Sequence, residues 1–116
     1  MGVKGTTTMN IYRLSIYRMT QNGHGYEVFT KDFKRYVSAH LSGVIFAKSV
    51  ASRDVGLFRD DSRFTPVEPK TYDADEFSVE VKAGSDVVMS YKIRIDAVDI
   101  ATEALCTEDF KKFAVA

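Results

Sequence analysis

The feature that most constrains the fold is a strict alternation of apolar and polar residues on both sides of a turn. Residues 76–82 place Phe77, Val79 and Val81 on one face, and residues 87–95 continue the same alternation after the turn residues 83–86. A period of two is typical of a half-buried β-strand. The two runs therefore predict an antiparallel hairpin in which Tyr91 and Ile93 are buried while Lys92 and Arg94 are exposed.

A second hairpin is predicted near the N-terminus. Residues 9–20 are rich in β-formers and place Tyr12, Leu14 and Ile16 on one face. The turn at 21–25 contains Asn-Gly, which readily adopts the positive φ angles of a tight turn. Residues 26–29 can then pair back as a second strand.

A helix is predicted over residues 31–41, with Thr30 as its N-cap and Gly43 as its C-terminal stop. The apolar stripe of this helix consists of Phe33, Tyr36, Val37, His40 and Leu41, at helical spacing. Leu41 is expected to point into the core. Its replacement by alanine should then cost about 2 to 5 kcal/mol of unfolding free energy.

The structure of the remaining segments is predicted from shorter sequence patterns. Residues 44–50 are apolar and favour a buried strand, although a continuation of the helix fits so few residues as well. Residues 55–59 favour a short strand, and residues 60–70, with two prolines, a surface loop. Residues 96–116 turn alanine-rich and favour a helix, followed by a short terminal helix that begins at Thr107.

Together these elements predict an α+β fold with a mainly antiparallel sheet of four to six strands and helices on one face. The order is roughly ββα-β(β)-ββ-αα. A chain of 116 residues is too short for two self-sufficient cores. We therefore expect a flexible N-terminal leader at residues 1–8 and a single domain at residues 9–116.

Composition limits the cellular context. No apolar run approaches the roughly 20 residues that a membrane-spanning helix needs. The chain has a single cysteine, Cys106, which cannot form an internal disulfide. We therefore expect a cytoplasmic protein.

Residues that could perform chemistry are few and poorly spaced. The nitrogen and sulfur ligands are His24, His40 and Cys106, none at the spacing of a metal site. The carboxylates of Asp54, Asp60 and Asp61 lack the ordered pattern of a calcium loop. No nucleophile with a neighbouring base is apparent, so we expect no enzyme, no metal and no cofactor.

The N-terminal half favours a binding role. Residues 1–63 carry a net charge of +5 and residues 64–116 one of −5. Aromatic and basic residues interleave in the first part of the chain, and the candidate partner-binding residues are Tyr12, Arg13, Tyr17, Arg18, Lys34 and Arg35. We expect a protein partner and an accessory or inhibitory role of the kind found in phages and mobile elements. The alternative is binding of RNA or single-stranded nucleic acid, and edge strands would allow a homo-oligomer such as a homodimer.

Overall fold

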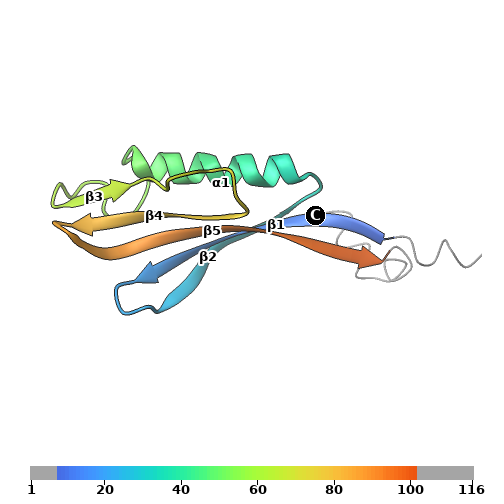
Figure 1. Ribbon diagram of the computed structural model, residues 1–116, viewed down its shortest axis with the longest axis horizontal. Helices are drawn as coiled ribbons and strands as arrows, with labels where there is room; N and C mark the ends of the chain where they lie inside the picture. The colour runs from blue at the N-terminus through green and yellow to red at the C-terminus, as the bar shows by residue number, and fades with distance from the viewer. Residues whose placement is uncertain (1–7, 102–116) are drawn as a thin grey trace, which may run out of the picture.

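A computed structural model describes residues 8–101. They form a five-stranded antiparallel sheet in the order β2-β1-β5-β4-β3 with one helix on one face, which confirms the α+β class (Figure 1). The elements are β1 (Thr8–Thr20), β2 (Gly25–Phe33), α1 (Tyr36–Ala51), β3 (Phe64–Val67), β4 (Glu76–Ala83) and β5 (Asp86–Ala101).

The two longest strands, β1 and β5, are neighbours inside the sheet and pair along the whole of β1, from Thr8 opposite Ala101 to Thr20 opposite Met89. Leu14 lies opposite Ile95 and Ile16 opposite Ile93, so their side chains share the face that α1 covers. The apolar residues of β4 complete this layer, with Phe77, Val79 and Val81 all buried as predicted. The core therefore lies between the sheet and the helix.

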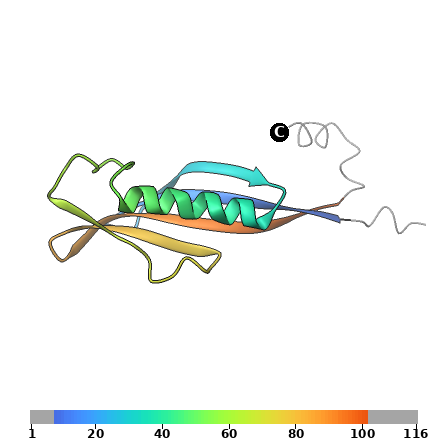
Figure 2. The same cartoon turned by 90° about the horizontal axis from the view of Figure 1, so that it is seen from above.

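Helix α1 runs along the sheet, with β2 to one side and β3 and β4 to the other (Figure 2). Its buried face consists of Ala39, Gly43, Ala47 and Val50. A Cβ atom on Gly43 would lie 2.8 Å from Cγ2 of Ile93, which is closer than real Cβ contacts allow. Gly43 is therefore a point of close approach in the middle of the helix, and its prediction as a helix stop was wrong.

The predicted start of the helix was also wrong. Residues 31–33 extend β2, where Phe33 pairs with Tyr12 of β1, and Thr30 is a strand residue. Arg35 precedes the helix in an extended conformation and provides no side-chain cap. Pairing with a neighbouring strand thus outweighed the local helix signal.

Three further segments differ from the prediction. Residues 44–50 continue α1, which was the alternative to the favoured strand, and residues 55–59 form bends and turns where a strand was expected. The expected loop at 60–70 contains β3. This strand lies at the edge of the sheet, where Pro66 is tolerated because an edge position does not need every backbone N–H.

The two predicted hairpins are confirmed. Tyr91 and Ile93 are buried, while Lys92 and Arg94 lie on the other face and are half-buried. Strand β5 continues to Ala101 because it pairs with β1 as far as Thr8, so the helix expected from residue 96 was wrong up to residue 101. The helices predicted over 102–116, and the leader except for Thr8, lie outside the described residues.

Candidate functional site

The six predicted partner-binding residues do not form one surface. Tyr12 and Arg18 lie on the face of β1 that α1 covers, whereas Arg13 and Tyr17 alternate to the opposite face of the sheet. The remaining two, Lys34 and Arg35, are exposed in the connection between β2 and α1. The structure therefore divides this group among three locations.

On the face opposite α1, charges are largely paired. Arg13 Nε lies 2.8 Å from Asp32 Oδ1, and this hydrogen bond raises the pKa of Arg13. Two further pairs on this face are Lys92 with Glu76 at 3.3 Å and Arg94 with Asp96 at 2.9 Å. These three cations already have carboxylate partners, so this face is poorly suited to bind a phosphate backbone.

On the covered face, Arg18 and Tyr12 are engaged within the fold. The guanidinium of Arg18 lies 5.1 Å from the ring of Tyr26 and 5.9 Å from that of Tyr91, and it also donates a hydrogen bond to the Tyr26 hydroxyl. Tyr12 contacts the ring of Tyr36 edge-on, with centroids 5.8 Å apart. Arg18 is thus held against rings of β2 and β5, and Tyr12 packs between the sheet and the helix.

The largest exposed aliphatic side chains on an element of regular structure lie on α1. Val37 is 67% exposed, Leu41 56% and Ile45 57%. Their spacing of four residues aligns them along the outer side of the helix. We refer to these three residues as the α1 stripe.

Sequence reasoning missed this surface. It placed Val37 and Leu41 in the core and Ile45 in a strand, because bulky apolar residues usually mark the buried face of a helix. The signal that could have found it is the set of small residues with the same spacing, Ala39, Gly43 and Ala47. Small residues at every fourth position allow a helix to approach its neighbour closely.

The connection between β3 and β4 lies against one flank of α1. The hydroxyl of Tyr36 donates to Asp75 Oδ1 at 2.6 Å, and His40 Nε2 lies 2.5 Å from the carbonyl oxygen of Tyr72. The hydrogen bond to Asp75, with some burial, raises the pKa of Tyr36 to about 12. Burial and a 2.6 Å hydrogen bond to Glu68 raise the pKa of Tyr72. These contacts fix one flank of the helix and leave the α1 stripe exposed.

The charges on α1 and in the two residues before it have one sign. Helix α1 contains no Asp or Glu, and its single charged residue is Lys48. Lys34 and Arg35 precede the helix, and all three cations are exposed without an ion pair among residues 8–101. The apolar stripe is therefore bordered by positive charge at both ends of the helix.

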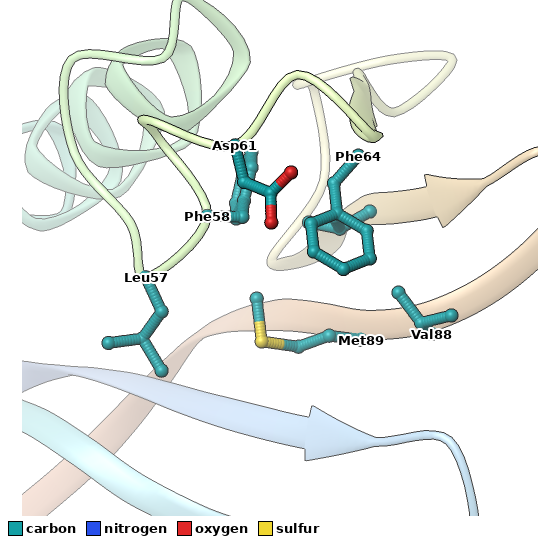
Figure 3. A pocket seen from close by; sticks show the side chains of 7 residues that line it. Leu57, Phe58, Asp61, Phe64, Val88 and Met89 are labelled. Carbon is teal, nitrogen blue, oxygen red and sulfur yellow. The ribbon is translucent and has the colours of Figure 1, made fainter.

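A pocket of about 380 Å³ lies beyond the C-terminal end of α1, where the β4–β5 hairpin extends past the helix (Figure 1). There the connection 52–63 covers the sheet in place of the helix and leaves a hollow (Figure 3). The walls are apolar and consist of Leu57, Phe58, Phe64, Val81, Val88 and Met89.

The one polar residue that lines this pocket is Asp61. Arg63 donates to its carboxylate from Nη2 at 2.6 Å, from Nε at 3.0 Å and from its backbone N–H at 3.0 Å. These bonds lower the pKa of Asp61 to about 2. The carboxylate is thus ionised and already neutralised by a neighbour, so it is poorly suited to act as a general acid or base near neutral pH.

Within residues 8–101, no group of three or more His, Cys, Asp or Glu side chains could hold a metal ion. His24 is exposed in the β1–β2 turn, and His40 is stacked on Tyr36 and bonded to a backbone carbonyl. Cys106 lies outside the described residues.

The same part of the chain contains no helix long and apolar enough to cross a membrane. No protein family, curated protein or solved structure matches this chain.

Proposed function

We propose that this chain is a non-catalytic protein-interaction module that binds its partner through the α1 stripe and acts as a cytoplasmic accessory or inhibitory protein. The observation that carries the proposal is the exposure of Val37, Leu41 and Ile45, each more than half exposed on one line. A surface helix normally turns charged and polar residues to solvent. Contiguous apolar surface of this kind marks a protein-binding site.

The positive charges near the α1 stripe favour a partner surface that carries carboxylates. The stripe is bordered by Lys34, Arg35 and Lys48, with no carboxylate on the helix itself. A partner surface with an apolar centre and carboxylates at its margin would complement this arrangement. Such a partner would bury the stripe and pair the three cations at the same time.

Nucleic-acid binding is the alternative. The same three cations favour it, because they are exposed and have no ion pair within the described part of the chain. The paired charges on the opposite face of the sheet, such as Arg13 with Asp32, count against it. We rank it second because the apolar stripe would have no role in contacting phosphates.

The test is affinity capture from native lysate, with and without nuclease. The main variant replaces Val37, Leu41 and Ile45 with serine, and the matched control is Tyr17→Ala on the opposite face of the sheet. We expect a nuclease-resistant protein that wild type and the control capture and the stripe variant does not. Circular dichroism should show that all three proteins are folded to the same extent.

Two results would reject the proposal. The first is that the stripe variant still captures the partner while Tyr17→Ala does not, because the binding site would then lie on the opposite face of the sheet. The second is a complex that nuclease dissolves and that weakens steeply with salt, because phosphate contacts are screened by counterions. In that case Lys34→Ser with Arg35→Ser should be the more damaging change.

A further inference from the structure

The pocket beyond the end of α1 has the properties of a preformed site. Arg53 holds the connection 52–63 by donating hydrogen bonds to the backbone carbonyl oxygens of Asp61, at 3.3 Å, and Phe64. The β4–β5 hairpin provides the opposite wall through Val81, Val88 and Met89. The pocket therefore lies between the β4–β5 hairpin on one side and, on the other, the connection 52–63, which the hydrogen bonds of Arg53 hold in place.

Electrostatics around the pocket favour a neutral occupant. The guanidinium of Arg53 lies 6.0 Å from the ring centre of Phe58, and that of Arg63 lies 5.4 Å from the ring centre of Phe64. Both aromatic walls thus already have a cation beside them, which disfavours a second one. The carboxylate of Asp61 is bound to Arg63, so it offers no free charge to a ligand.

Size and shape favour an aromatic ring. An apolar cavity of about 150 Å³ is enough to bind benzene. The volume of about 380 Å³ here accommodates a larger ring, such as that of tryptophan. At the mouth of the pocket Leu57 is 71% exposed, so apolar surface continues outward from the hollow.

The pocket lacks the groups that would orient a free small molecule. Small-molecule sites combine apolar walls with a few precisely placed polar groups. Here the single polar side chain in the lining is occupied by Arg63. An occupant whose orientation is set by its own attachment to a protein backbone does not need such groups.

We propose that this pocket binds a neutral aromatic side chain, with the size of tryptophan, that a protein partner inserts as an anchor. The proposal rests on the protein-binding function proposed above and adds a second contact to it. Buried aromatic anchors in pockets contribute much of the affinity of protein interfaces. A free aromatic molecule is the competing occupant.

The experiment titrates the full chain, labelled at methyl groups, with N-acetyltryptophanamide and with indole, and follows the methyl signals by NMR. We expect saturable shifts of the methyl groups of Leu57, Val88 and Met89, with a dissociation constant of about 1 mM, as is usual for so small a ligand. The methyl groups of Val37 and Ile45 should not shift. N-acetyltryptophanamide should bind at least as tightly as indole, because the pocket is open to a backbone.

Two variants and one matched control test whether the compounds bind in this pocket. Val88→Phe fills the pocket and should weaken binding at least tenfold, while Val87→Phe, on the neighbouring residue outside the lining, should leave it unchanged. Leu57→Ala removes only an exposed side chain at the mouth and should weaken binding several-fold without unfolding the protein. It keeps the test valid if Val88→Phe fails to fold.

Three results would overturn the inference. They are no saturable shift with either compound, shifts that spread to Val37 and Ile45, and indole binding more than tenfold tighter than N-acetyltryptophanamide, which would identify a free small molecule as the occupant. In the capture experiment, Leu57→Ala should reduce the yield of partner. If the partner is lost only with the stripe variant, this inference fails and the proposed function stands.

Discussion

The two faces of α1 are built in opposite ways. The face against the sheet carries Ala39, Gly43 and Ala47, which are small and fully or almost fully buried, while the outer face carries large aliphatic residues that are more than half exposed. Most surface helices show the reverse, with bulk inside and polar groups outside. Here the bulk of the core comes from the strands, and the helix approaches them closely. Large apolar side chains on a helix therefore do not by themselves identify its buried face.

The largest loss of stability is expected when bulk is added to the buried face of α1. Gly43→Leu should lower the free energy of unfolding by about 3 kcal/mol, because overpacking forces the sheet and helix apart. A Cβ at this position already lies 2.8 Å from Cγ2 of Ile93 and 3.2 Å from Cδ1 of Leu14. The gain of about 1 kcal/mol in helix propensity is too small to compensate. Urea denaturation followed by circular dichroism measures the effect.

A double-mutant cycle tests whether contact with Ile93 causes this loss of stability. Ile93→Ala removes the atom that a new side chain at position 43 would meet, so Gly43→Leu should cost less in that background than in wild type. Additive effects of the two changes would show that the cost of Gly43→Leu does not come from contact with Ile93.

The contrast between the two faces of α1 also explains which parts of the fold could be predicted from the sequence. The buried face of the hairpin was predicted correctly over residues 77–81 and 91–95, because a period of two is unambiguous where both strands alternate strictly. The alternation was wrong at Val87, which pairs with Lys82 beyond a register shift after Val81. The helix was misplaced because its bulky residues, such as Leu41, follow helical spacing on the wrong side. Its true limits depend on pairing between Phe33 and Tyr12 and on contact between Gly43 and Ile93, which join residues far apart in the sequence.

The candidate site was less predictable than the fold. Interleaved aromatic and basic residues on β1 suggested one surface, but alternation along a strand necessarily sends Tyr12 and Arg13 to opposite faces. The α1 stripe is exposed because side chains of the strands fill the core and the helix contributes mostly small residues to it. No local sequence pattern indicates how much of the core the strands fill. The pocket depends on how far the β4–β5 hairpin extends past the helix, which is a tertiary property.

The same substitution, valine to alanine, can be made on each face of α1. Val50→Ala should lower the free energy of unfolding by about 2 kcal/mol, because Val50 is fully buried and two methyl groups are lost. Val37→Ala, on the outer face, should change it by less than about 0.5 kcal/mol. Both changes raise helix propensity equally, so the difference reports burial alone. Equal losses at the two positions would mean that the faces are not distinct.

A smaller effect is expected where the two faces meet, at Tyr36. Its pKa is raised from 10 to about 12 by the hydrogen bond to Asp75, so the neutral phenol stabilises the folded state. This contribution is present below about pH 10 and is lost as the pH rises through about 12. Tyr36→Phe should cost below about 1 kcal/mol at neutral pH, because one hydrogen bond of a partly exposed group is lost. Absorbance at 295 nm during alkaline titration should show one late-ionising tyrosine fewer.

Asp75→Asn is the control for this prediction. It removes the charge that holds the proton on Tyr36, so the same phenol should ionise at lower pH while the ring remains in place. An unchanged titration curve in Asp75→Asn would show that the hydrogen bond does not set the pKa of Tyr36.

The smallest effect on stability is expected at Leu41, in the centre of the α1 stripe. Leu41→Ala should change the free energy of unfolding by less than about 0.5 kcal/mol, because the side chain is 56% exposed. The matched control Leu14→Ala, at a fully buried leucine, should cost about 2 to 5 kcal/mol in the same urea titration. A cost above about 1 kcal/mol for Leu41→Ala would mean that the stripe is covered in the free protein. Such a result would remove the exposed surface on which the protein-binding proposal depends, whereas a neutral substitution leaves Leu41 free to contribute its apolar surface to a partner.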